Sequence, residues 1–598
     1  MSPLFIAPLR RAHVISPFGP GALTLMPNRV SVIVTAPRTW LRSEPVRPPG
    51  SPSMLLELTI TDRHLQAATG VQRFVQPPAA GDDPIKSQDW LLPAARFPLA
   101  EACANPGCQR MVPRDNSDVA EGRCDRCTAP GSKRRWPTFQ VATVLACQGG
   151  HLADVDWDAW LHAQPGSACA KPDLGYQVGA SPDRPTVRCY GCARKVTFAP
   201  EADFPCPGQR PWLPGTDPQP CQLRARPIER TSTSMHYTWQ LSALTLPIVG
   251  ATNPALLHAL SDNTALTPLR RLDAQGRDEK TLTEMLAIVG GLALGTTRDE
   301  LVAHLDALAA DAPTPPTRAA ELDALTSADH PNRVTNHLPD LIVEPRDPAD
   351  YRAAYLGPHL AALSAIPRLR ETRVMAGFTR IEPAPADPAV GYEQLWGRPR
   401  PDTFPPGAND DWLPGYRVYG EGILLVLDPD AVERWVRRAA GAPRLCAASR
   451  SAPTGTDAQR PLQWLLAHTL AHLLMRAAAP ESGYPLPALR ERVFATDART
   501  AFLVYTAAGD VHGTLGGLVE LAEPARLVPL LDAAVDSARW CATDPVCGED
   551  ATGARTRGTS PGACHHCLYV PETSCEAFNH GLDRALVQGQ HGVPGFLA

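Results

Sequence analysis

Short apolar runs of strand length mark the first hundred residues. Residues Ala22 to Met26 and Val30 to Thr35 flank a Pro27-Asn28 turn, and Met54 to Ile60 alternates in part between apolar and polar positions. Alternation with a period of two is typical of strands that bury one face. The pattern predicts a β-rich N-terminal domain over residues 1–100.

Apolar positions at helical spacing take over in the middle of the chain. They predict helices over Pro254 to Asp262, Leu282 to Leu292 and Asp299 to Ala310, and the last of these opens with acidic residues that suit a helix N-terminus. The proline-rich run Ala312 to Thr317 ends the pattern. We therefore expect a helical region over residues 231–330.

Strand and helix patterns mix in the remainder of the chain. A mixed α/β region over residues 331–445 contains a predicted strand, Gly422 to Leu427, and a predicted helix, Ala431 to Ala440. A linker of small residues around Ala447 to Thr456 then leads into a C-terminal domain over residues 446–598. In that domain the pattern predicts two helices around one strand, over Pro461 to Arg476, Arg526 to Trp540 and Ala501 to Thr506.

Length and composition set the broad class of the protein. At 598 residues the chain exceeds what one hydrophobic core uses, so we expect several domains. Its 44% hydrophobic and 20% charged residues, with a formal net charge of -5, are typical of a soluble globular protein and exclude a basic nucleic-acid coat. The sequence has neither a recognisable secretion signal nor a run of roughly 18 apolar residues that would span a membrane. We predict a cytoplasmic, multidomain α+β protein.

Cysteine is the most informative residue type. Of the sixteen cysteines, ten lie between Cys103 and Cys221 and five between Cys541 and Cys575. Because a reducing compartment keeps thiols free, close Cys-x-x-Cys pairs indicate metal sites rather than disulfides. We expect structural Zn²⁺ at two or three sites, most of them in a cysteine-rich, zinc-ribbon-like module over residues 101–230.

The first cysteine cluster has the spacing of a zinc ribbon. Cys103-x4-Cys108 and Cys124-x2-Cys127 each supply two thiolates, and the polar segment between the two pairs suits a loop. Four thiolates close the coordination sphere of a tetrahedral zinc, so the predicted role is structural rather than catalytic.

The next block of the module offers seven candidate ligands, which is more than one zinc takes. Cys189 and Cys192 form half a site, and we complete it with Cys169 and Cys206. Two interpretations stay open for Cys147 with His151, because the pair suits a further metal half-site and Cys147 also suits a buried free thiol. Whether Cys221 coordinates a metal stays open as well.

The C-terminal cysteines predict another closed site of four thiolates. Cys541 lies upstream of this set, and the adjacent His565 and His566 are expected to face solvent because they lie inside a tight knuckle. The predicted ligands are Cys547, Cys564, Cys567 and Cys575.

Motifs for catalysis are weak. None of the five lysines follows a glycine, which excludes a recognisable nucleotide-binding P-loop. Asp278 and Lys280 match the end of a metal-dependent nuclease motif, but no strand pattern precedes them. His468 and His472 lie four residues apart on a predicted helix, a spacing that a metal could use, yet the glutamate of a His-Glu-x-x-His motif is missing. We favour packing over metal binding for this histidine pair and predict no catalytic residue.

Two basic clusters are candidate contacts to nucleic acid, because arginine pairs with phosphate oxygens and stacks on bases. Arg380 follows the second cluster. The predicted contacts are Lys133, Arg134 and Arg135 in the first cluster and Arg368, Arg370 and Arg373 in the second.

Several motifs together resemble known families. The C-terminal part resembles the uncharacterised zinc-binding domain that accompanies certain bacterial superfamily 2 helicases, through His468-Thr-Leu-Ala-His-Leu-Leu474, Leu489-Arg-Glu-Arg492, Tyr505-Thr, Gly513-Thr-Leu-Gly-Gly517 and Pro571-Glu-Thr-Ser-Cys575-Glu576. Most of the chain resembles the DrmB family of DISARM anti-phage systems, through Phe18-Gly-Pro-Gly-Ala22, the run Cys147 to Trp160, Cys206-Pro-Gly-Gln-Arg-Pro-Trp-Leu213 and Gly377-Phe-Thr-Arg-Ile381, which occur in the family's order.

The resemblance implies a function that spacing alone does not reach. It implies a non-motor, non-enzymatic subunit that partners a DrmA-like superfamily 2 helicase and helps to bind foreign DNA. It also matches Cys547, Cys564, Cys567 and Cys575 to the cysteines of the helicase-associated domain and supplies no catalytic residue. The alternatives are a metal-dependent nuclease or hydrolase acting on phage DNA, and a protein-interaction scaffold without DNA contact.

Overall fold

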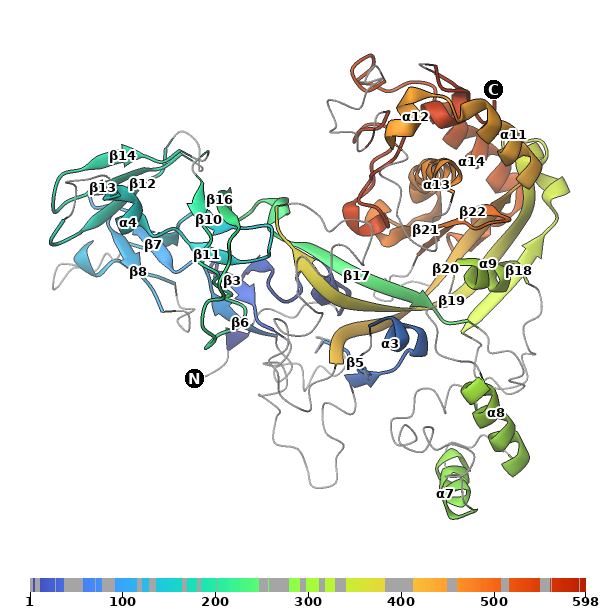
Figure 1. Ribbon diagram of the computed structural model, residues 1–598, viewed down its shortest axis with the longest axis horizontal. Helices are drawn as coiled ribbons and strands as arrows, with labels where there is room; N and C mark the ends of the chain where they lie inside the picture. Colours follow the sequence, from blue (N-terminus) through green and yellow to red (C-terminus); the bar gives the residue numbers. More distant parts are fainter. Residues whose placement is uncertain are drawn as a thin grey trace. The chain divides into compact units, whose positions relative to one another are not determined.

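The computed structural model shows a chain of mixed helix and strand, so the expected multidomain α+β class is confirmed (Figure 1). The structure describes residues 4–5, 11–26, 28–36, 58–69, 71, 73–77, 92–115, 121–127, 136–163, 169–179, 184–199, 201, 203–246, 256, 279–290, 297–310, 318–327, 340–381, 412–448, 460–506, 516–548, 560, 562–590 and 592–598. None of the helices among these residues is long and apolar enough to cross a membrane.

The chain divides into two compact units, each assembled from three separated segments. Unit 1 contains the cysteine-rich module and takes residues 1–59, 73–241 and 374–416. Unit 2 contains the C-terminal cysteines and takes residues 60–72, 242–373 and 417–598.

The N-terminal part of unit 1 is built on a four-stranded sheet of order β1-β6-β3-β2. Strands β2 (Leu23–Leu25) and β3 (Ser31–Val34) form the hairpin that the sequence predicts, with Leu23 opposite Ile33. Every residue of β3 is buried, as suits a central strand. The other elements of this part of unit 1 are β1 (Leu4–Phe5), α1 (Arg11–Ile15), β5 (Arg73–Val75) and β6 (Pro93–Arg96), while α3 (Arg63–Thr69) belongs to unit 2 and β4 (Thr59–Ile60) lies at the boundary between the two segments.

The cysteine-rich module consists of three small antiparallel sheets with short connections. One has the order β8-β7-β9, another β11-β10-β16-β15 and the third β12-β13-β14. Their bounds are β7 (Ala100–Cys103), β8 (Met111–Pro113), β9 (Thr138–Gln140), β10 (Thr143–Ala146), β11 (Leu152–Asp154), β12 (Leu174–Gln177), β13 (Thr186–Cys189), β14 (Lys195–Thr197), β15 (Phe204–Pro205) and β16 (Arg224–Glu229), with helix α4 (Trp157–Leu161) after β11.

Unit 2 contains an antiparallel sheet whose strands are longer than the sequence predicts. The predicted strand Gly422 to Leu427 is the end of β20 (Trp412–Leu427), which pairs with β22 (Thr500–Thr506). Strand β22 pairs in turn with β21 (Leu489–Ala495), and β18 (Leu341–Arg346) pairs with the 20-residue strand β19 (Leu360–Thr379). Strand β17 (Tyr237–Leu244) is a neighbour of β19 in the sheet order.

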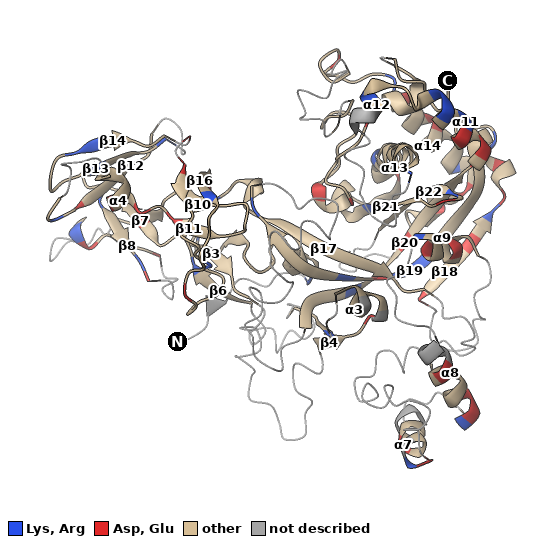
Figure 2. Ribbon diagram, in the orientation of Figure 1, with Lys and Arg blue, Asp and Glu red and all other residues tan. Residues whose placement is uncertain are grey.

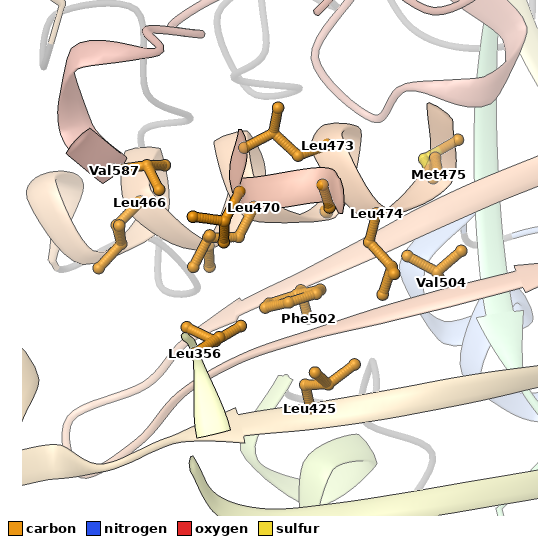
Figure 3. Packing of buried hydrophobic residues seen from close by; sticks show 14 of the residues in the cluster. Leu356, Leu425, Leu466, Leu470, Leu473, Leu474, Met475, Phe502, Val504 and Val587 are labelled. Carbon is orange, nitrogen blue, oxygen red and sulfur yellow. The ribbon is translucent and has the colours of Figure 1, made fainter. Parts of the chain in front are cut away.

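Helix α13 (Pro461–Ser482) is the centre of unit 2 and lies against β21 and β22 (Figure 1). It begins at a proline, which is favourable in the first helical turn, and ends at Gly483 with a φ of +76°. Its leucines pack against Phe502 and Val504 of the sheet (Figure 3). A helix buried on most of its circumference encloses its polar side chains too, so His468 and His472 lie inside the core.

Further helices cover this core. Helices α11 (Pro429–Ala439) and α14 (Pro524–Ser537) occupy the predicted positions, and α13 extends beyond the predicted end at Arg476 because alanines continue it. The predicted helices in the middle of the chain are α7 (Glu279–Gly290) and α8 (Arg298–Ala310), whereas most of Pro254 to Asp262 lies outside the described residues. The remaining helices are α9 (Arg318–Thr326), α12 (Pro443–Ala448) and α15 (Ala585–Gln588).

Candidate metal centres

Four groups of cysteine and histidine side chains converge in the described part of the chain, each able to hold a metal ion. Within each group the candidate ligand atoms lie within 4.8 Å of one another. A tetrahedral zinc with bonds of about 2.3 Å places its sulfur ligands about 3.8 Å apart, so the groups have the size of a zinc site.

The ribbon group consists of Cys103, Cys108, Cys124 and Cys127, the four residues predicted from their spacing. The Sγ atoms of Cys103 and Cys127 are 3.4 Å apart, and those of Cys108 and Cys124 are 3.9 Å apart. Cys103 ends strand β7, and the next turn folds back so that the backbone N–H of Asn105 donates to the Cys103 sulfur at 3.4 Å. Such donors favour the thiolate form that a metal requires.

The hairpin group joins Cys147, His151, Cys206 and Cys221. All four lie at the same end of the strands in the sheet β11-β10-β16-β15. At that end β10 and β15 finish, and β11 and β16 begin. The Nδ1 atom of His151 lies 3.5 Å from the Sγ of Cys147 and 3.6 Å from the Sγ of Cys206. Gly150, with a φ of +85°, makes the tight turn that returns His151 to Cys147.

The knuckle group joins His162, Cys169, Cys189 and Cys192. The His162 Nε2 atom lies 3.3 Å from the Sγ of Cys192, and the Sγ atoms of Cys169 and Cys189 are 3.8 Å apart. Gly191 permits this close approach, since a Cβ atom there would lie 2.3 Å from the carbonyl oxygen of Lys171. His162 was missed from sequence because it caps helix α4, outside any Cys-x-x-Cys pair.

Cys206 is the first correction to the predicted ligand sets. We expected Cys206 to complete a site with Cys169, Cys189 and Cys192. The structure instead places Cys206 in the hairpin group, and His162 is the fourth member of the knuckle group. Strand pairing is the reason. Strand β15 pairs with the start of β16 and places Cys206 there, whereas Cys189 is the last residue of β13, which belongs to a different sheet. The same pairing brings Cys147 and His151 close to Cys206 and Cys221, an arrangement that suits a metal site.

The C-terminal group joins Cys541, Cys547, Cys564 and Cys567. The Sγ atoms of Cys541 and Cys564 are 3.5 Å apart, and those of Cys547 and Cys567 are 3.7 Å apart. This corrects the predicted set, since Cys575 is not a member and Cys541 takes its place. The short turn after helix α14 brings Cys541 next to the pair Cys564 and Cys567, whereas Cys575 follows a separate 3-10 turn, Glu572–Ser574.

Neighbouring thiols in these groups have opposed pKa shifts. The hydrogen bond from Cys567 lowers the pKa of Cys547 to about 5, while the same contact and burial raise the pKa of Cys567. In the hairpin group the contact with Cys206 lowers the pKa of Cys147, and it raises the pKa of Cys206 to about 12. Two thiols this close cannot both lose their protons unless a cation balances the charge, so a divalent metal ion suits each group.

Arg380 is buried beside the hairpin group. Its guanidinium donates to the carbonyl oxygens of Gly150 and Gly21, both at 2.8 Å, and to that of Met235. Burial lowers the pKa of this side chain to about 9, and the charge of Cys147 opposes that shift. A zinc held by three thiolates and one imidazole carries a net charge of about -1, which the arginine would balance.

The predicted phosphate contacts are mostly not on the surface. Arg370 is buried and pairs with Asp340 at 3.1 Å, and Arg373 is buried and pairs with Glu371. Arg368 is half-buried and stacks over the ring of Tyr419 at 4.0 Å. Arg370 and Arg373 are therefore corrected from DNA contacts to internal ion pairs, because they lie on a strand whose polar positions face the interior. The first cluster, Lys133, Arg134 and Arg135, lies outside the described residues.

The residues of the enzymatic alternatives take other positions. Lys280 is exposed on α7, and Asp278 lies outside the described residues. His565 and His566 are exposed, as expected for residues inside a knuckle. His468 and His472 are buried and lie with Glu491 and Cys575 in a separate cluster.

Comparison with known proteins extends these observations. Residues 10–237, which include the ribbon, hairpin and knuckle groups, match a family described as a domain of unknown function, DUF8724. The chain is also 25% identical over 526 residues to the DISARM protein DrmB of Bacillus paralicheniformis, a similarity that covers 83% of this chain and 89% of that protein. The chain is similar to DrmB over most of both lengths. The resemblance to DrmB that the motifs predicted is thereby confirmed, while the likeness of the C-terminal part to a helicase-associated domain stays a prediction.

Proposed function

We propose that this chain is a non-motor subunit of a DISARM-type anti-phage complex, acts in the cytoplasm, partners a DrmA-like superfamily 2 helicase and helps to bind foreign DNA. The observation that carries the proposal is the similarity to DrmB over most of both chains. A match of that extent is expected when two proteins keep the same arrangement of domains, whereas a shared module alone would match in one part.

The four cysteine groups are proposed to hold structural Zn²⁺. Each offers four soft or borderline ligands from protein side chains, which leaves no open position for a substrate or an activated water. The role of the bound ions is therefore to fix short loops and small sheets that have little apolar core of their own. The ions would add rigid surfaces for the assembly rather than a reaction centre.

The helicase partner is proposed because the motor function is missing here. None of the five lysines follows a glycine, so this sequence has no recognisable P-loop. ATP hydrolysis by the complex would then come from the partner. Assaying this chain, the helicase and their mixture tests this, since ATPase activity of this chain alone would contradict the non-motor role.

For the DNA contact we propose the exposed arginines of helix α11. Its buried face consists of Ala431, Val432, Trp435 and Ala439, which leaves Arg434 and Arg437 exposed. Figure 2 shows basic residues along α11, with acidic residues on the same helix. Both arginines line a cavity of about 570 Å³ together with Arg438. Both arginines are exposed, and neither has an ion-pair partner among the described residues, so both are available to phosphate.

The test of this contact is DNA binding by the assembled complex at several salt concentrations. Arg434→Glu with Arg437→Glu is expected to weaken binding about tenfold or more and to flatten its salt dependence, because two phosphate contacts are lost. Arg352→Glu, a reversal at an exposed arginine outside α11, is the control and should leave affinity within about twofold. Unchanged affinity in the double variant would favour the protein-interaction scaffold.

The enzymatic alternative makes a different prediction. A nuclease or hydrolase would cleave DNA when this chain alone is supplied with a divalent metal. Cleavage that disappears in Lys280→Ala would overturn the non-enzymatic proposal. No cleavage by the chain alone, together with tighter DNA binding in the mixture with the helicase, supports it.

A further inference from the structure

A cluster of two histidines, one glutamate and one cysteine lies in the core of unit 2, apart from the four cysteine groups. His468 and His472 come from successive turns of α13, Glu491 from β21 and Cys575 from the segment after the 3-10 turn Glu572–Ser574. The two histidine and the glutamate side chains are 0% exposed, and Cys575 is 8% exposed. One ligand atom from each residue lies within 4.8 Å of the others.

The polar atoms of the cluster lie close to one another. The His468 Nε2 atom lies 2.9 Å from Glu491 Oε1 and 3.2 Å from the Sγ of Cys575. The His472 Nε2 atom lies 3.2 Å from Glu491 Oε2. Three different segments of the chain therefore meet at these atoms, and the carboxylate that the helix itself lacks comes from the neighbouring strand.

The contacts of His472 decide where its proton lies. Its Nδ1 atom is 2.9 Å from the carbonyl oxygen of Leu568, which accepts only, so Nδ1 carries the proton. In the neutral ring Nε2 is then an acceptor, and it lies 3.2 Å from Glu491 Oε2, which is also an acceptor. Two acceptor atoms this close together in a dry core are unfavourable without a positively charged partner that both can reach.

A second proton on His472 does not resolve this contact. Neither His472 Nε2 nor Glu491 Oε2 has a hydrogen-bond partner although the two atoms lie 3.2 Å apart, so a ring N–H at Nε2 would not point at the oxygen. Buried polar atoms without a partner are rare in proteins. Two such atoms side by side indicate a positively charged partner that both contact.

We propose that His468, His472, Glu491 and Cys575 form a fifth metal site, which holds a divalent ion of the zinc class. Two imidazoles, one carboxylate and one thiolate are ligands that zinc accepts in tetrahedral geometry. One carboxylate and one thiolate balance the two charges of the ion, so the buried site is neutral. The backbone N–H groups of Ala577 and Asn579 donate to the Cys575 sulfur at 3.3 and 3.2 Å, which supports its thiolate form.

The geometry assigns this ion a structural role. All four positions are taken by protein side chains, and the burial of the ligands leaves no path for a substrate. The ion ties helix α13 to strand β21 and to the C-terminal segment. This site stands independently of the proposed role in DNA binding and of the metal content of the cysteine groups.

Metal analysis of the purified full-length protein tests the site. His472→Gln is expected to contain one metal ion fewer per chain than the wild type, because one of four ligands is lost. The control is His580→Gln, the same change at a half-buried histidine near Cys575 and outside the cluster, which should keep the wild-type content. Equal metal content in the wild type and His472→Gln would overturn the proposal.

Anomalous scattering at the zinc edge from crystals of the unaltered chain gives a second readout that does not depend on a variant folding. A peak enclosed by these four side chains supports the site, whatever the cysteine groups contain. Peaks at the cysteine groups with none here overturn it. Absence of peaks at the cysteine groups would instead contradict the structural zinc proposed for them, so the two failures are distinguishable.

Discussion

His162 Nε2 lies 3.3 Å from the sulfur of Cys192, and the other nitrogen of the same ring lies 2.7 Å from the carboxylate of Asp158. The Nδ1–H group donates its hydrogen bond to the Asp158 carboxylate, so the Nε2 lone pair is free to bind a metal in the knuckle group. A histidine outside the Cys-x-x-Cys pair therefore completes this group.

Removing His162 tests that assignment. His162→Ala is expected to release one metal ion per chain, whereas His162→Cys should retain it, since a fourth thiolate also suits zinc. Asp158→Asn should weaken the affinity roughly 10- to 100-fold without removing a ligand. Chelator competition followed by metal analysis measures all three, and full metal retention in His162→Ala would exclude the histidine as a ligand.

Cys541 and Cys575 belong to different clusters, although sequence spacing favoured Cys575 for the C-terminal group. We expect Cys541→Ser and Cys575→Ser each to release one metal ion per chain, and the double variant to release two. Two residues of one site would instead give the same loss singly and together. Metal analysis of the three proteins distinguishes the cases, and Ser574→Ala, beside Cys575 but outside the cluster, is the control.

The spacing of cysteines along the chain was sufficient to predict a complete ligand set only where the ligands lie in pairs a few residues apart. The ribbon group comes together as expected because each half of it is a tight turn that brings two cysteines together. The hairpin group depends on the pairing of β10 with β16, which joins residues about eighty positions apart, and no local pattern encodes that pairing.

Buried charged side chains explain why the sequence did not predict strand β19 of unit 2. Strand β19 was missed because Arg370, Glu371 and Arg373 interrupt its apolar pattern. These side chains are nevertheless buried, because Arg370 pairs with Asp340, Glu371 accepts from Tyr505 of β22, and Arg373 pairs with Glu371 on the same strand. The same reasoning wrongly placed two of these arginines on the surface. By contrast, α13 and β22 were predictable since apolar runs dominate both, with 14 of the 22 residues of α13 and all seven residues of β22 buried.

Arg380 is expected to hold the core of unit 1 together. Arg380→Met leaves the carbonyl oxygens of Gly21, Gly150 and Met235 buried without donors, at a cost of about 1–3 kcal/mol for each. Arg380→Lys should recover only part of the loss, because a lysine cannot reproduce the planar fork. Thermal unfolding measures the effect, with the exposed Arg352→Met as control, and an unfolding temperature within a degree of wild type would contradict this role.

Glu371 should make the stability of unit 2 dependent on acid pH. The side chain accepts hydrogen bonds from Tyr505 at 3.0 Å and from Arg373 at 2.8 Å. Burial alone would raise its pKa, but the charges of Arg373, Arg490 and Arg492 outweigh burial and hold the pKa at about 2, below the ordinary 4.5. A lowered pKa stabilises the fold at pH values above 4.5, and this contribution is lost as the pH falls from 4.5 toward 2.

Glu371→Gln isolates this contribution because it keeps the shape of the side chain and removes the charge. At neutral pH the variant should be less stable than wild type by an amount on the order of 3 kcal/mol, and the difference should shrink as the pH falls below about 4.5. Acid also protonates thiolate ligands in both proteins, so the difference in free energy of unfolding between them, from denaturant titrations at matched pH, is the quantity to measure. A difference that stays constant with pH would show that the carboxylate does not titrate below its ordinary range.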